Sequence, residues 1–364
     1  MKKSLIALLL LLSYAVQGCA HSEPTVAEKA AKLLIVGVTG KSLTPNNPII
    51  EDIADKGVSG VIFFGYNVAT FDDTSDPRAQ FTKFVSDLKA VRDYPLLVTI
   101  DQEGGLVNRM KTQSGFAAMP SHQEVGRYAN VDSVRVAAEL ISSEVASVGI
   151  NFNFAPCVDV DVNPACPVIG KVKRSFSSDE KYVAACASIY VEEHRKRGVL
   201  TSLKHFPGHG NSLADSHHGL TDITATWQER EFYPYKSLME SGLCDAVMVS
   251  HLYNENFDEE YPATLSRKTI QGVLREQLGW QGVVVSDDMQ MKAITDHYGF
   301  EDAVVLGLNA GIDLFIIGGN IKREDYNVVD KFISIIESAV ESGAVTMETL
   351  DAAVARIDKL VERL

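Results

Sequence analysis

The sequence lacks the features that mark several large classes of protein. Its five cysteines include no CxxC pair, so the spacing of a cysteine-bound zinc site is missing. Lysine and arginine total 34 against 48 aspartate and glutamate residues, and the net charge of -14 argues against a nucleic-acid partner, which needs a basic surface. No linker or internal repeat divides the chain. No segment beyond the first twenty residues is long and apolar enough to cross a membrane.

The first twenty residues are typical of an export signal. Two lysines precede an apolar run from Leu5 to Leu12, and this order predicts a signal peptide over residues 1–18. The stretch Val16-Gln17-Gly18-Cys19 resembles a bacterial lipobox, in which Cys19 is lipidated and becomes the first residue; plain secretory cleavage is the alternative. We therefore expect residues 19–30 to be a tether, and the protein to be exported to the periplasm or cell envelope and held to a membrane by lipid.

The other four cysteines have structural interpretations. Cys157 and Cys166 lie in one loop and are near enough in sequence to pair in an oxidising compartment. Cys186 and Cys244 sit in apolar helix or strand patterns, where we expect inert core thiols.

Short apolar segments recur along the chain and alternate with segments of helical periodicity. The eight predicted strands are Leu33–Gly37, Gly60–Phe64, Leu96–Ile100, Ile150–Phe154, Leu200–Lys204, Ala246–Ser250, Val283–Ser286 and Leu314–Ile317. The predicted helices include Phe81–Val91, Ser133–Val148, Lys181–Arg197, Lys268–Leu278, Ala303–Asn309 and a last helix, Met347–Leu364. Eight such units with fully apolar strands predict an α/β fold, a closed (β/α)8 TIM barrel in a single domain over residues 31–364. An open doubly wound sheet is the alternative, but no GxGxxG follows the first strand.

Polar residues gather where the predicted strands end. Because the carboxyl ends of barrel strands meet at one mouth, we expect these side chains to lie in one site. They comprise Asp101–Gly105 with Arg109, Asn153, Asp159, Asp161 and Arg174, Lys204–Ser212 with Asp215–His218, Ser250-His251, Ser286–Met289 and Gly318-Gly319.

Each of these groups has a structural interpretation when taken alone. An aspartate at a strand end often caps the next helix, and Lys204-His205 fits an internal ion pair. Four histidines from His205 to His218 suggest a metal site, but Pro207 and Gly208 prevent the helical pairing of His205 with His209, so we expect no metal and no cofactor. A functional site is favoured because six of the eight strands end in charged or imidazole groups on one face.

Carboxylates beside lysine and arginine donors suit a neutral, hydroxyl-rich ligand such as a sugar. A glycosidic bond is cleaved when an ionised carboxylate attacks carbon one and a second group protonates the leaving oxygen. An imidazole can carry that proton near neutral pH, and an aspartate two residues earlier can fix its tautomer. Asp215 and His217 have this spacing, which points both side chains the same way in an extended loop.

Three motifs of the chain resemble those of one enzyme family. Lys204-His-Phe-Pro-Gly-His-Gly-Asn, followed by Asp215-Ser-His217, resembles the signature of the β-N-acetylglucosaminidases of glycoside hydrolase family 3. Asp101-Gln-Glu-Gly-Gly and Ser286-Asp287-Asp288-Met are similar to two further family motifs, in the same order. The resemblance covers about residues 32 to 364, and Leu106 stands where family members usually have arginine.

The resemblance implies a (β/α)8 barrel and a retaining double displacement. Carried over by position, Asp287 matches the nucleophile that forms the glycosyl-enzyme, His217 matches the acid/base, and Asp215 matches its partner. Successive residues at a strand end point opposite ways, so the residues alone leave Asp287 and Asp288 open, and the match favours Asp287. The positions that match residues gripping the N-acetylglucosamine unit are Asp101, Arg109, Arg174, Lys204 and His205.

These observations predict an exported, lipid-anchored exo-β-N-acetylglucosaminidase of the β-N-acetylhexosaminidase class. Its expected partners are β-linked N-acetylglucosamine oligosaccharides or muropeptides, taken from peptidoglycan fragments or chitin, and a membrane reached through the lipid on Cys19. Two alternatives stay open. One is a phosphorylase that passes the sugar to phosphate, and the other is a sugar-binding lipoprotein that has lost the reaction.

Overall fold

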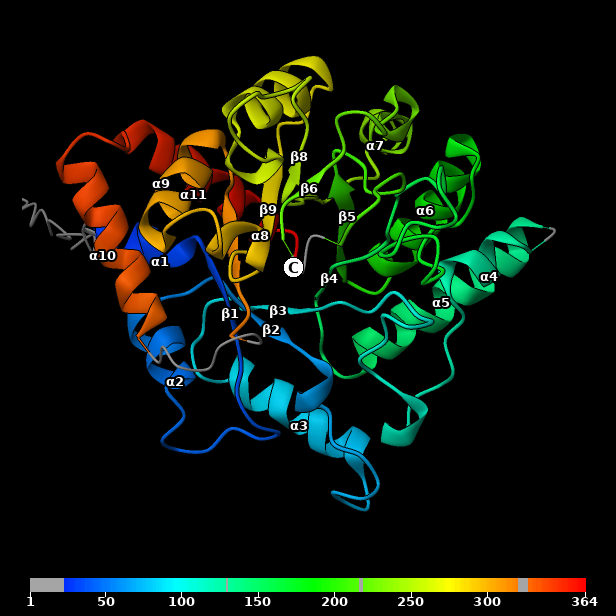
Figure 1. Cartoon of the computed structure of the whole chain (residues 1–364). Helices are drawn as coiled ribbons and strands as arrows, with labels where there is room; N and C mark the ends of the chain where they lie inside the picture. Colours follow the sequence, from blue (N-terminus) through cyan, green and yellow to red (C-terminus); the bar gives the residue numbers. More distant parts are fainter. Residues whose placement is uncertain (1–22, 129, 216–218, 320–326) are drawn as a thin grey trace, which may run out of the picture.

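Eight parallel strands lie at the centre of the fold and close into a barrel, in the order β1-β10-β9-β7-β5-β4-β3-β2 (Figure 1). The computed structural model describes residues 23–128, 130–215, 219–319 and 327–364. The barrel strands are β1 Leu34–Gly37, β2 Gly60–Phe63, β3 Leu97–Ile100, β4 Phe152–Asn153, β5 Leu200–Phe206, β7 Ala246–Val249, β9 Val283–Asp288 and β10 Leu314–Ile317. The predicted (β/α)8 barrel is confirmed.

Helices surround the barrel and join successive strands (Figure 1). They are α1 Val26–Lys32, α2 Ile49–Glu51, α3 Pro77–Lys89, α4 His122–Gly126, α5 Val131–Ser147, α6 Glu180–Arg195, α7 Tyr233–Glu240, α8 Lys292–Thr295, α9 Phe300–Ala310, α10 Val328–Glu341 and α11 Met347–Val361. The 3-10 helices are η2 Gly65–Asn67, η3 Thr112–Ser114, η4 Glu229–Phe232 and η5 Ala263–Leu265. The π-helices are η1 Asp52–Lys56 and η6 Lys268–Gln277. The predicted helices are found as α3, α5, α6, η6, α9 and α11, with shifted ends.

The start of the described chain is a helix where a tether was expected over residues 19–30. Thr25 caps α1, and a reciprocal bond from Glu28 completes a capping box. The helix is held to α11, because Lys32 Nζ lies 2.8 Å from Asp358 Oδ1. The structure therefore differs from the expected tether from Val26 onward, where the chain is already part of the folded domain.

The strands β5 and β9 extend further toward the barrel mouth than predicted. The register of β5 on β7 shifts between Leu203 and Phe206, and that of β10 on β9 shifts between Leu314 and Ile316. The peptide bond between Lys204 and His205 is cis. These irregular ends carry Lys204, His205, Asp287 and Asp288 as part of the sheet. Beyond the barrel, β6 Thr221–Asp222 pairs in parallel with β8 Leu252–Tyr253.

The opposite end of the barrel is tied to the last helix. Arg356 Nε of α11 donates to Asp313 Oδ1 at 2.8 Å, and Arg363 donates to the buried carboxylate of Asp245. Asp245 and Asp313 stand directly before β7 and β10, so α11 is fixed where strands begin. The four cysteines among the described residues are buried free thiols, and Cys157 is therefore not bonded to Cys166. In the described part of the chain, no helix has both the length and the apolar character needed to cross a membrane.

Candidate active site

The predicted sugar-binding residues come together at the carboxyl ends of the strands. Asp101 directly follows β3, Arg174 lies in the connection after β4, and Lys204 and His205 lie near the carboxyl end of β5. Arg109 Nη2 approaches Asp101 Oδ2 at 3.6 Å. The structure thus joins all five residues in one network of contacts.

Lys204 is the buried cation of this network. Its Nζ lies 2.7 Å from Asp101 Oδ1 and 2.7 Å from Glu103 Oε1. Burial lowers the pKa of Lys204, but the charges of Asp101 and Glu103 outweigh this effect and leave its pKa raised. Burial likewise raises the pKa of Asp101, and the charges of Lys204 and Arg109 reverse the shift and lower it. Both partners therefore stay ionised.

Arg174 is held by two planar hydrogen bonds to one carboxylate. Its Nε donates to Glu103 Oε2 at 2.9 Å and its Nη2 donates to Glu103 Oε1 at 2.7 Å. Burial raises the pKa of Glu103, but the charges of Arg174 and Lys204 prevail and hold it well below its usual range. Glu103 therefore neutralises two buried cations at once.

The tautomer of His205 follows from its two partners. Arg174 Nη2 lies 2.9 Å from His205 Nε2, and a guanidinium can only donate, so Nε2 accepts. The ring proton then lies on Nδ1, which is 2.6 Å from Asp159 Oδ2. Asp159 is only 1% exposed and also accepts the backbone N–H of His209 at 2.7 Å. His205 is therefore a neutral ring locked between a carboxylate and a guanidinium.

These contacts form a row in which charges of opposite sign alternate. The row runs from Asp159 through the neutral His205 to Arg174, Glu103, Lys204, Asp101 and Arg109. Its far end is the most exposed part, where the Asp101 and Arg109 side chains are 18% and 30% exposed. The sequence motifs place Glu103 and Asp159 at strand ends, but neither residue was predicted to bind the sugar or to take part in the reaction.

The two neighbouring aspartates of β9 have different surroundings. Asp288 Oδ1 accepts the backbone N–H of Gln290 at 3.0 Å and that of Gly318 at 3.2 Å, across to the end of β10. Its carbonyl oxygen accepts a hydrogen bond from His251 Nε2 at 3.0 Å. Asp287 Oδ1 accepts the N–H of Asp288 at 2.8 Å, and its side chain is half-buried. The Asp288 side chain therefore holds the end of β9 to the residue that follows β10.

The proposed acid/base dyad is described only in part. Asp215 is half-buried, at the end of the loop that follows β5, whereas His217 lies outside the described residues. Residues 1–22 also lie outside them, and so does Cys19. The roles of Asp215, His217, Asp287 and Cys19 stay predictions at this point.

One cluster in the described ranges has donors suited to a metal ion. The side chains of Cys157, Asp159 and His205 offer ligand atoms within 4.8 Å of one another. Cys157 Sγ donates to Asp159 Oδ2 at 3.1 Å, and burial together with the Asp159 charge raises the pKa of the thiol well above its usual range. Hydrogen bonds between a protonated thiol, a carboxylate and a neutral imidazole account for this cluster.

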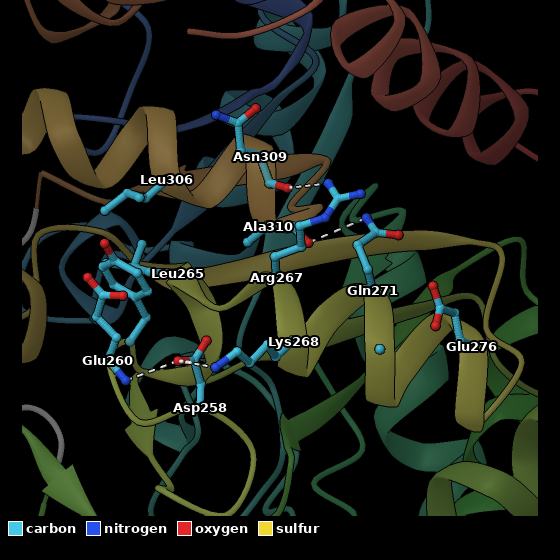
Figure 2. Close-up of a pocket in the computed structure, with 12 residues that line it drawn as sticks. Asp258, Glu260, Leu265, Arg267, Lys268, Gln271, Glu276, Leu306, Asn309 and Ala310 are labelled. Carbon is cyan, nitrogen blue, oxygen red and sulfur yellow. Dashed lines mark hydrogen bonds and ion pairs between the residues drawn. The ribbon is translucent and has the colours of Figure 1, made fainter.

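A second concavity lies on the outer ring of helices, between η6 and α9 (Figure 2). It has a volume of about 490 Å³, and Asp258, Glu260, Arg267, Lys268 and Asn309 are among the side chains that line it. None of the predicted site residues contributes to it. We therefore place the candidate active site at the barrel mouth.

Comparison with known proteins identifies the family. The description "Glycosyl hydrolase family 3 N terminal domain" matches residues 25–360. The chain belongs to glycosyl hydrolase family 3. This family 3 chain is 35% identical over 294 residues to the "Beta-hexosaminidase" of Xylella fastidiosa (strain M23), an alignment that covers 78% of this chain and 83% of the relative.

Two longer relatives match this family 3 chain over most of its length. It is 30% identical over 338 residues to "Beta-hexosaminidase A" of Pseudoalteromonas piscicida, covering 86% of this chain but only 55% of that protein. The solved β-N-acetylglucosaminidase of Paenibacillus sp. str. FPU-7 superposes with a TM-score of 0.84 at 33% identity, covering 93% of this chain and 62% of the other. The chain thus spans little more than half the length of these two relatives.

The lowered pKa of Glu103 predicts how its contribution to stability depends on pH. Because its folded-state pKa lies below the unfolded value, the contribution is complete above pH about 4.5 and is lost as the pH falls through the folded pKa. Glu103→Gln leaves two buried cations short of a counter-charge, so we expect it to lower the free energy of unfolding at pH 7 by about 3 kcal/mol. Urea unfolding at pH 7 and pH 3 should show this deficit shrinking in acid, because pH 3 lies well below the unfolded pKa of about 4.5.

The matched control is Glu240→Gln, which removes an exposed carboxylate 3.9 Å from Lys236. We expect it to change the free energy of unfolding by less than about 0.5 kcal/mol. A deficit for Glu103→Gln that is the same at both pH values would contradict the assigned charge state.

Proposed function

We propose that this protein is a retaining exo-β-N-acetylglucosaminidase. It removes terminal N-acetylglucosamine from peptidoglycan fragments or chito-oligosaccharides through a covalent glycosyl-enzyme. The observation that carries the proposal is the row of contacts from Asp159 to Arg109, which gathers all five predicted sugar-binding residues at the mouth of a family 3 barrel. Its resemblance to proteins named beta-hexosaminidase and β-N-acetylglucosaminidase supports the choice of sugar.

The row suits a sugar because its exposed end offers both kinds of hydrogen-bonding group. Asp101 accepts from sugar hydroxyls, while Arg109 donates to sugar oxygens. The charges are already paired with one another, so these groups are fixed in place before the sugar arrives and lose little freedom when it binds. A neutral sugar leaves the charge balance of the row unchanged.

The reaction is a double displacement in which His217 carries one proton. In the first step, an oxygen of Asp287 bonds to carbon one as the bond to the leaving oxygen breaks, and His217 gives its proton to that oxygen. In the second step, water attacks carbon one, His217 takes the proton of the water, and the bond to Asp287 breaks. Asp215 stabilises the imidazolium form of His217.

The contacts of Asp288 support Asp287 as the nucleophile. The Asp288 carboxylate accepts two backbone N–H groups, and a Cβ atom added at Gly318 would lie 2.5 Å from its Oδ2, so it is enclosed against β10. Asp287 uses Oδ1 for the adjacent N–H, and this bond fixes the plane of its carboxylate. A fixed, ionised carboxylate is what attack on carbon one requires.

Replacing Asp287 tests the nucleophile directly. Asp287→Asn keeps an oxygen for the N–H of Asp288 but removes the negative charge, so we expect kcat to fall by a factor on the order of 1000 or more. The measurement is p-nitrophenol release from its N-acetylglucosaminide, with and without phosphate. Asp87→Asn, which alters an exposed pair with Lys83, is the control and should retain full activity.

A 5-fluoro N-acetylglucosaminide should add one sugar mass to the peptide that contains Asp287. Full-rate release by Asp287→Asn would refute the mechanism, and activity that requires phosphate would favour the phosphorylase. Absence of both turnover and trapping would favour the sugar-binding alternative.

The proposed dyad predicts a bell-shaped dependence of kcat on pH. The first step needs protonated His217 and the second needs the neutral ring, so its pKa in the enzyme–substrate complex sets the basic limb. The negative charge of Asp215 raises that pKa, and Asp215→Asn should therefore move the basic limb to lower pH by about one unit. Steady-state rates between pH 4 and 9 provide the measurement. An unchanged profile would show that Asp215 does not act on His217.

We propose that the protein is exported and anchored to a membrane by lipid on Cys19. The support is the sequence pattern alone, because residues 1–22 lie outside the described part of the chain. Growth with radiolabelled palmitate should label the full-length protein, and Cys19→Ser should abolish the label without lowering the specific activity of the purified protein. Equal labelling of the two proteins would exclude this anchor.

A further inference from the structure

Glu231 is a buried carboxyl that the proposed reaction does not use. It lies in η4, is 1% exposed, and packs against the loop that follows β5. Its Oε2 accepts the backbone N–H of Gly210 at 3.1 Å, and its Oε1 accepts the backbone N–H of Gln228 at 3.1 Å. One side chain therefore joins the loop that follows β5 to the segment that leads into η4.

The loop fits closely against this side chain. Gly208 has a φ of +127°, and a Cβ atom added there would lie 2.7 Å from Glu231 Cβ and 2.9 Å from its Oε2. On the other side, a Cβ atom added at Gly210 would lie 1.7 Å from the carbonyl oxygen of Val160. The turn is thus enclosed between η4 and the loop after β4, and glycine is required at both positions.

Two further hydrogen bonds join the same two segments. Trp227 Nε1 donates to the carbonyl oxygen of Pro207 at 2.9 Å, and Asn211 Nδ2 donates to that of Thr226. The Trp227 ring packs on two phenylalanine rings, with centroid distances of 4.6 Å to Phe232 and 4.8 Å to Phe257. The segment from 226 to 231 is therefore a rigid support for the turn from 207 to 211.

We propose that Glu231 is a positioning residue of the active site. It holds the turn from 207 to 211, and thereby sets the place from which the chain continues to Asp215, only four residues beyond Asn211. This inference rests on the proposed function, since Asp215 matters there as part of the dyad. Glu231 touches neither the sugar nor the reacting atoms.

A carboxyl is suited to this position because both of its oxygens accept from different segments. An amide offers one acceptor oxygen, and its NH2 group would face a backbone N–H. Burial raises the pKa of Glu231 to about 8, with the Asp159 charge adding to the rise and the N–H groups of Gln228 and Gly210 and the Arg230 charge opposing it. The two acceptor oxygens are present in either protonation state, so the function of Glu231 rests on its geometry.

The test compares Glu231→Gln with Glu229→Gln, the same change at an exposed residue of the same helical turn. For Glu231→Gln we expect kcat on p-nitrophenyl N-acetylglucosaminide to fall about tenfold, because a small displacement of catalytic groups lowers the rate steeply. KM should change less than about twofold, because Asp101 and Arg109, at the sugar-facing end of the row, are not among the hydrogen-bond partners of Glu231. Amide exchange in the peptide spanning 207–215 should be about tenfold faster. Glu229→Gln should match the wild type in all three measurements.

If the wild type is active and Glu231→Gln has an unchanged kcat, the positioning role of Glu231 is refuted and the proposed function stands. A rise in KM at constant kcat would refute the positioning role in the same way. If Glu231→Gln does not fold, Trp227→Phe decides, because it removes the donor to Pro207 and keeps an aromatic ring; it should lower kcat at constant KM and speed the same amide exchange. A wild-type protein without activity on this substrate would refute the proposed function, and the inference with it.

Discussion

The mouth of the barrel depends on one buried carboxylate, that of Glu103. It lies between Arg174 and Lys204, two cations that would be strongly destabilising in the protein interior if either lacked a counter-charge. On one side Asp101 pairs with Lys204, and on the other side Asp159 accepts a hydrogen bond from the His205 ring. Each charge therefore has an opposite charge or a polar ring beside it. The result is a fixed set of donors and acceptors built from strands that are far apart in sequence, and its outer end is the part that the proposed sugar would contact.

Much of the barrel could be predicted because its strands are continuous runs of branched apolar residues. β4 is the instructive exception, since the sequence predicted Ile150–Phe154 and the ladder holds only Phe152–Asn153. The side chain of Asn151 accepts from Val98 N at 2.7 Å and donates to Leu96 O at 2.8 Å, in addition to the backbone hydrogen bond from Asn151 N to Val98 O at 3.2 Å. A side chain that imitates the backbone has no periodic signal. For α1 the signal was present, because Thr25 and Glu28 have capping-box spacing.

The residues of the candidate site were likewise predicted only in part. The motifs placed Asp101, Lys204, His205 and Asp287 at strand ends, and the barrel geometry brought the first three together with Arg174. The importance of Glu103 and Asp159 was not visible, because it lies in their partners, which stand 71 and 46 residues away along the chain. Glu231 gave no signal at all, since its surroundings form only when the loop after β5 folds onto η4. Residue type and spacing predict which chemistry is available, whereas pairing over long sequence separations is decided by the fold.

The two ends of the folded domain meet on one side of the molecule. The helix α1 leads directly into β1 and is paired with α11, which is itself fixed by Arg356 and Arg363 to the end of the barrel where strands begin. The candidate active site lies at the other end, where strands finish. If Cys19 carries the proposed lipid, the lipid would be attached upstream of α1, whose following strand begins at the end of the barrel opposite the candidate active site.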